Sequence, residues 1–213
     1  MRKPNRMIYQ TDETRSLILE VAEALFAEKG FAATQMKDVA AAANISRASL
    51  YRYYRDKVDL GFAALEMVAE KFSEQFGSLL TQVDGRNARE RLMCIALQIA
   101  DPDDFQTENR FVAEFDAFFS SSNIPEDFSH RLPSLHEELV MELRQIARQG
   151  FEDGSIRDDL TAAEVVNLVI FPLRTAQHML LLRSEALSTF SAKEKRSYLH
   201  NLSRVISDGL KPQ

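Results

Sequence analysis

The sequence is poor in the residues that support disulfides, metal clusters and tight sheet turns. Its single cysteine, Cys94, excludes an internal disulfide and a multi-cysteine metal site. Seven glycines and six prolines in 213 residues leave little room for the turns of a large sheet. The basic start of the chain is not followed by an apolar run, which argues against a secretory signal. We therefore expect an all-α, cytoplasmic protein.

Signals for catalysis are also missing. His136 and Glu137 begin like a zinc-protease helix, but Val140 stands where the second histidine is required. No Gly-rich phosphate loop or nucleophile elbow occurs, and the four histidines have no spacing that recommends a metal. Cys94 lies among apolar residues, so a buried, inert thiol is favoured over a redox sensor, which needs an exposed thiolate. We expect no catalytic residue, no metal and no cofactor.

Two short helix patterns around a tight turn occupy residues 34–57. Gly30 ends the preceding helix, and Thr34 is expected to cap the first of the two. Apolar residues then recur at helical spacing up to Ala43, which gives one narrow packing face. Asn44 tolerates the left-handed backbone that such a turn commonly needs, and Ile45 is expected to plug the turn into the core.

The second helix carries a surface suited to a major groove. Ser46 is a good N-cap, while Leu50 and Tyr54 give an apolar inner side. Arginines can pair with guanine, an alanine methyl can touch thymine, and hydroxyls reach bases or phosphates. Those residue types make up the outer side, which consists of Arg47, Ala48, Ser49, Tyr51, Arg52 and Tyr53. Lys57, just after the capping residue Asp56, is expected to meet a phosphate.

The alternative is an ordinary helical hairpin with a solvated polar face. Charge argues against it, because residues 44–57 hold four basic side chains and one acidic, whereas the whole protein has a net charge of −6. Residues 1–60 carry a net +2 and residues 61–213 a net −8. An acidic body is repelled by DNA, so this split predicts a DNA-binding domain over 1–60 and a second domain over 61–213. The basic N-terminal arm is either a minor-groove contact or simply loose.

The stretch from Thr14 to Leu60 resembles the N-terminal domain of the TetR/AcrR transcriptional regulators. The similarity rests on AEKGF, T-x-x-x-D-V-A, S-R-A-S-L-Y-R-Y-Y and D-K-x-x-L. The sequence departs from the usual pattern at Asn44, Ala48 and Tyr54, which leaves the operator sequence open. The resemblance implies a base-facing role for the second helix, and phosphate contacts for Thr34, Gln35, Tyr51 and Lys57.

Long helix patterns follow in the acidic body. The first runs from Lys57 to about Leu80, with an apolar residue every fourth position, and joins the two parts as a lever. The others are expected at 88–100, around 111–119, at 134–152, at 165–182 and at 191–210. The helix at 165–182 is apolar on almost every side, which a monomer of this size can rarely bury, and the last helix adds further apolar residues. These two helices therefore predict a homodimer, as the family resemblance also implies, and Pro172 should kink the first of them.

An effector pocket is the other expected feature of the body. Phe111, Phe115 and Phe118 share a helix face, which is either ordinary core or one wall of a pocket between helices. Arg174 and His178, beside Pro172, are the candidate polar anchors. Further apolar lining is expected from Met93 and Phe171.

The sequence thus predicts a homodimeric regulator that binds a palindromic DNA operator. The family resemblance implies a repressor released by a small, largely apolar effector, with no membrane partner. A transcriptional activator, an architectural helix-turn-helix protein without a ligand, and an enzyme with a DNA-binding appendage remain alternatives.

Overall fold

The computed structural model describes residues 6–82, 86–100, 106–119, 126, 137–182 and 191–212. Every regular element in these ranges is a helix, as the sequence predicts. The helices are α1 (Arg6–Lys29), α2 (Met36–Ala42), α3 (Arg47–Tyr53), α4 (Lys57–Gln82), α5 (Ala88–Ile99), α6 (Gln106–Phe118), α8 (Glu137–Glu152), α9 (Ala162–Leu182) and α10 (Ala192–Gly209). The basic N-terminal arm lies outside the described residues, apart from Arg6 at the start of α1.

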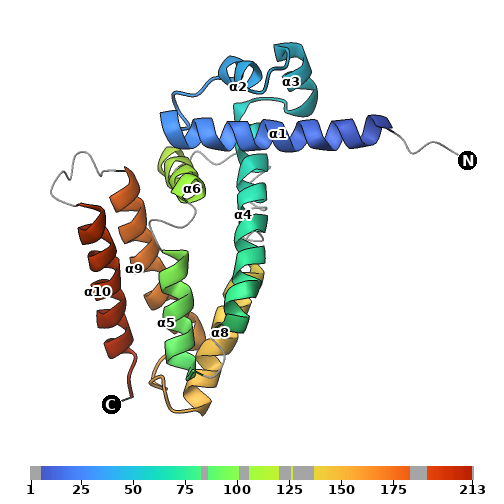
Figure 1. Cartoon of the computed structure of the whole chain (residues 1–213). Coiled ribbons are helices and arrows are strands. Elements are labelled where there is room, and N and C mark those ends of the chain that lie inside the picture. Colours follow the sequence, from blue (N-terminus) through green and yellow to red (C-terminus); the bar gives the residue numbers. More distant parts are fainter. Residues whose placement is uncertain are drawn as a thin grey trace, which may run out of the picture.

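The molecule has two packed regions that α4 connects. Figure 1 shows α1 crossing the upper end of α4, with α2 and α3 beyond α1, with α5 and α8 beside the lower part of α4, and with α9 and α10 on the far side of α5. The buried apolar residues form two clusters accordingly, one centred on α1 to α4 and the other on α5, α8 and α9. Helix α6 supplies Phe111, Val112 and Phe115 to the first cluster, although it follows α5 in the chain.

The turn residues adopt the conformations that the sequence predicts. Gly30 and Asn44 have positive φ angles of 83° and 52°, which end α1 and shape the turn between α2 and α3. The hydroxyl of Ser46 accepts a hydrogen bond of 3.0 Å from the Ser49 amide and caps α3. A carboxylate oxygen of Asp56 accepts one of 2.9 Å from the Asp59 amide at the start of α4.

Helix α4 buries the side on which its apolar residues repeat. Leu60, Ala64, Val68 and Phe76 are buried, so the lever helix packs against both clusters along its length. Since α4 is continuous from Lys57 to Gln82, a domain boundary at residue 60 would lie inside a helix and stays a prediction.

Candidate DNA-binding surface and effector cavity

The outer side of α3 is available to a ligand. Arg47, Ala48 and Arg52 are exposed, as are Gln35 and Ser46 at the starts of α2 and α3. Tyr51 is 49% exposed, whereas Leu50 and Tyr54 on the opposite side are buried. Ser49 and Tyr53 are half-buried. Capping at Ser46 and burial at Leu50 and Tyr54 together fix which side of α3 faces outward.

Thr34 does not have the expected position. Helix α2 is capped by Gln35, whose backbone amide donates a hydrogen bond of 3.1 Å to the Asp38 carboxylate. The cap expected at Thr34 is therefore wrong by one residue. Thr34 is only 1% exposed, and its hydroxyl donates to the carbonyl oxygens of Gly30 at 2.9 Å and Leu25 at 3.2 Å. Its side chain therefore fastens the turn after α1 and is not placed to contact a phosphate.

Lys57 is half-buried and also makes contacts within the protein. Its Nζ donates to the carbonyl oxygens of Phe31 at 2.8 Å and Ala32 at 3.0 Å, and lies 4.8 Å from the centre of the Phe31 ring. Burial lowers the pKa of this amine. An ammonium has three N–H donors and the two carbonyls accept from two of them, so the expected phosphate contact stays a prediction and a structural role is added.

Two of the three phenylalanines in the stripe are core residues. Phe111 and Phe115 are 0% and 2% exposed, and the Phe115 ring lies 5.1 Å from that of Phe31 and 5.0 Å from that of Phe62. Phe118 is 42% exposed, and its ring is tilted against that of Phe31 with 5.0 Å between the ring centres. None of the three lines the cavity described next, and the packing of Phe111 and Phe115 against α1 and α4 favours the core alternative, so the expected pocket role stays a prediction.

The opposite side of α6 faces a cavity of about 530 Å³. Val112 and Asp116, four residues apart, point to this cavity, which lies between α4, α6, α8 and α9. Most of the lining is apolar. The lining residues are Leu65, Ile99, Val112, Asp116, Leu139, Val140, Leu143, Val166, Asn167, Ile170, Phe171, Arg174, Thr175 and His178.

Three of the residues predicted for the effector, Phe171, Arg174 and His178, do line the cavity, whereas Met93 does not. Met93 instead lies in a groove between α5 and α10, together with the half-buried Cys94. The sequence favours a buried Cys94, but in the structure this residue is only half-buried. Asp116 was missed, although its spacing of four from Val112 on the far side of the phenylalanines was a usable signal.

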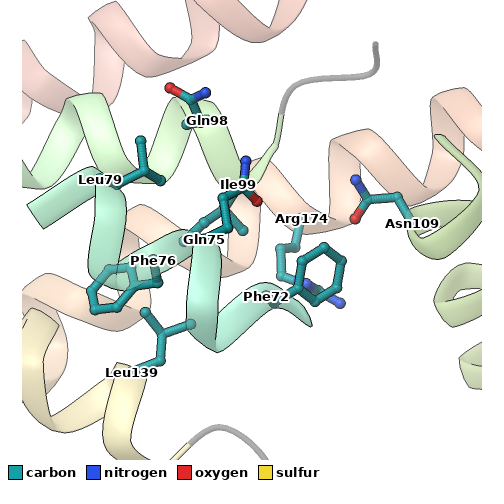
Figure 2. A pocket seen from close by; sticks show the side chains of 9 residues that line it. All are labelled: Phe72, Gln75, Phe76, Leu79, Gln98, Ile99, Asn109, Leu139 and Arg174. Carbon is teal, nitrogen blue, oxygen red and sulfur yellow. The ribbon is translucent and has the colours of Figure 1, made fainter. Parts of the chain in front are cut away.

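Arg174, His178 and Asp116 form the polar end of the cavity. The Arg174 Nη2 lies 3.5 Å from the His178 Nε2, and the His178 Nδ1 lies 3.9 Å from an Asp116 carboxylate oxygen. Burial and the nearby Arg174 charge lower the pKa of His178 to about 4. At neutral pH the imidazole is uncharged. Arg174 also reaches a smaller hollow of about 30 Å³ beside Phe72 and Asn109, which Figure 2 shows.

An ionic cluster joins α1, α4 and α6. The Nζ of Lys71 lies 2.9 Å from a Glu23 carboxylate oxygen and 3.1 Å from one of Glu108. The Glu23 side chain is only 4% exposed, and burial raises its pKa. With the phenylalanine core, this cluster connects the helix that lines the cavity to the helix beneath α2 and α3.

Helices α9 and α10 expose apolar side chains, as the sequence predicts. Leu168, Phe171 and Met179 on α9 are 49%, 65% and 47% exposed, and Tyr198 and Val205 on α10 are 47% and 70% exposed. Leu202 turns inward, because it packs against the second core cluster. Among the described helices, α9 alone is long and apolar enough to cross a membrane, but core helices of soluble proteins meet the same criteria.

Similarity to known proteins agrees with this arrangement. A family model described as "Bacterial regulatory proteins, tetR family" matches residues 18–64, which contain α2, α3 and the adjoining parts of α1 and α4. This part of the chain therefore matches the TetR family of transcriptional regulators. The resemblance read from the sequence is confirmed.

Individual relatives match this chain mostly over part of their length. The transcriptional repressor KstR of Rhodococcus jostii is 39% identical over 87 residues, which are 41% of this chain and 39% of that protein. The repressor KstR2 of Mycobacterium tuberculosis is 26% identical over 168 residues, with 73% and 76% covered. Matches to the first three curated relatives cover 39%, 36% and 24% of their lengths.

A solved structure with a similar fold is FadR of Bacillus subtilis in complex with stearoyl-CoA. Its TM-score is 0.73 at 13% identity, over 92% of this chain and 98% of that one. At this identity the likeness shows the fold alone.

Proposed function

We propose that this chain is a dimeric, cytoplasmic repressor that binds a palindromic operator and leaves it when a small molecule fills the cavity. The observation that carries the proposal is the outer side of α3. It presents Arg47, Ala48 and Arg52 to solvent on a helix whose cap and inner side hold it in place. Arginine and small side chains on a helix of this size suit the major groove.

Two exposed apolar helices support dimerisation. Side chains such as Phe171 and Val205 leave a large apolar surface on α9 and α10, which a second copy would cover. A two-fold dimer would present two α3 helices to two half-sites, so a palindromic operator follows from the symmetry.

The cavity supports control by a ligand over an architectural role. Its volume of about 530 Å³ lies in the range of small-molecule sites, and its lining is mostly apolar with a few polar groups. Helix α6 lines it with Val112 and holds the α1 region with Phe115. A ligand that displaces α6 would therefore also move α1, and α4 would transmit the shift to α3.

Release requires that the effector bind the released conformation more tightly than the DNA-bound one. A hundredfold preference corresponds to about 2.7 kcal/mol. The names of KstR and KstR2 as repressors support repression, and activation is the alternative outcome.

Binding to duplexes from the promoter regions beside its own gene tests the proposal. We expect one duplex with an inverted repeat to bind far more tightly than the rest, with an affinity that falls steeply with salt. Equal binding to all duplexes would defeat it.

The Arg47→Ala variant tests the reading role in the same assay. We expect a loss of about 1–3 kcal/mol on the preferred operator and relaxed preference at one base pair in each half-site. Uniform weakening across all sequences would instead make Arg47 a backbone contact.

A further inference from the structure

We propose that the cavity takes an amphipathic effector with an apolar body and a single anionic head, and that Arg174 binds this head. The inference rests on the proposed function, because it assumes that the cavity is the effector site. It adds the sign of the charge that the site recognises. Three ionisable side chains line the cavity among the described residues, namely Asp116, Arg174 and His178.

Arg174 supplies the positive charge. It sits on α9 between the main cavity and the smaller hollow in Figure 2, and it lines both. Among the described residues, no carboxylate lies within ion-pair distance of its guanidinium, and the hydrogen-bond partner there is His178 at 3.5 Å. Burial lowers the pKa of Arg174. A desolvated guanidinium without a carboxylate is costly, so an anionic ligand gains from pairing with it.

His178 and Asp116 offset this charge only in part. His178 is neutral at pH 7 because its pKa is about 4, so it offers a hydrogen bond without adding charge. The Asp116 side chain is 56% exposed, so water reaches its carboxylate, although burial raises the pKa of this carboxyl and the nearby Arg174 charge lowers that pKa. The deeper charge is positive and the outer one negative, which favours an anion over a cation in the interior.

The rest of the lining sets the nature of the body. Leu65, Leu143 and Ile170 come from three different helices and present aliphatic surface to the same space. A ligand that fills this space must be mainly hydrocarbon, because polar groups there would lose their hydrogen bonds to water.

Titration of the full-length protein with octanoate, octanol and octylamine separates charge from apolar burial. The three probes share one hydrocarbon chain and differ in their heads. We expect octanoate to bind at least tenfold more tightly than octanol, and octylamine to bind more weakly than octanol, by calorimetry at pH 7. Equal affinities for octanoate and octanol, or tighter binding of octylamine, would overturn the inference.

Two variants, one that removes a positive charge and one that removes a negative charge, test which side chain binds the anionic head. Arg174→Met should weaken octanoate binding at least tenfold and leave octanol binding unchanged, whereas Asp116→Asn should preserve or strengthen octanoate binding. If Arg174→Met does not fold, Arg174→Lys should retain the preference for octanoate over octanol. Unchanged octanoate binding in a folded Arg174→Met protein would remove Arg174 from the site.

Operator binding, measured separately on the wild-type protein, keeps the two proposals apart. Specific operator binding that only a neutral compound releases would preserve the proposed function and defeat the anion inference. Octanoate binding that depends on Arg174 in a protein that binds no operator would support the charge assignment and defeat the repressor.

Discussion

At the scale of single residues, side chains that the sequence predicts as DNA contacts also make hydrogen bonds that stabilise the fold. The contact between the Lys57 ammonium and the carbonyls of Phe31 and Ala32 spans more than twenty positions in the chain. Local sequence patterns contain no information on such a contact. The same holds for Thr34, whose hydroxyl bonds the Leu25 carbonyl.

Replacing Lys57 by Ala tests which role dominates. We expect a loss of about 1 kcal/mol in the free energy of unfolding, because two carbonyls lose a charged donor that is partly exposed. Thermal unfolding measures this loss, and the salt dependence of operator binding measures the phosphate contact. If the variant kept the wild-type melting temperature but its operator affinity depended less on salt, Lys57 would contact phosphate and its hydrogen bonds to the two carbonyls would not stabilise the fold.

His178 makes a prediction about pH. Its pKa is about 4 in the folded protein and about 6.5 when unperturbed, so protons favour the unfolded chain between these values. The stabilisation is present above pH 6.5 and is lost as pH falls toward 4, by up to about 3 kcal/mol. The His178→Gln variant should therefore show a flatter stability profile over this window in urea unfolding. Parallel profiles for the variant and the wild type would place the imidazole in contact with solvent.

At the scale of elements, the crossing of α4 with the phenylalanine core depends on Gly61. A Cβ atom at this position would lie 2.6 Å from the Phe31 ring and 2.8 Å from that of Phe115. Helix α4 can approach this core so closely because no side chain intervenes.

Gly61→Ala should therefore destabilise the protein by about 1–3 kcal/mol through overpacking. Gly77→Ala is the matched control, since it lies on the same helix with no atom within 4 Å of the new Cβ. We expect the control to stabilise by about 0.5–1 kcal/mol through helix propensity. Unfolding midpoints for both variants check this pair, and similar shifts at the two positions would refute the tight crossing.

The helix-turn-helix could be predicted from the sequence because its determinants are local. Gly30, Asn44 and Ser46 each act on backbone within a few residues, so their types reveal the turn and the cap. The cavity could be predicted only in part. Helix α6 is apolar on two sides, and only its neighbours decide whether Phe115 or Val112 faces the open space. The part of the cavity on α9 could be predicted because Arg174 and His178 are ionisable residues in the middle of a mainly apolar helix.

At the scale of the whole molecule, the exposed residues of α9 and α10 identify where a second copy should bind. Leu202 on α10 packs against the second core cluster, so a substitution there would test folding and not dimerisation. Val205 is the better probe because it is 70% exposed on α10.

The Val205→Glu variant should raise the dimer dissociation constant about a hundredfold, since a charge without a partner is penalised in an apolar interface. Sedimentation velocity measures the shift toward monomer, and palindrome binding should weaken with it. Met141→Glu is the control, because Met141 is 61% exposed on α8. A dimer that tolerates Val205→Glu but not Met141→Glu would move the interface to α8.

The division of α6 into two sides has a consequence for how such a sensor can change. A substitution at Asp116 alters what the cavity accepts, while Phe111, Val112 and Phe115 in the first core cluster keep their hold on α1. Ligand preference and signal transmission therefore reside in alternate positions of one helix and can vary independently. Mutagenesis restricted to the cavity side of α6 should yield biosensors with new specificities that still switch the same promoter.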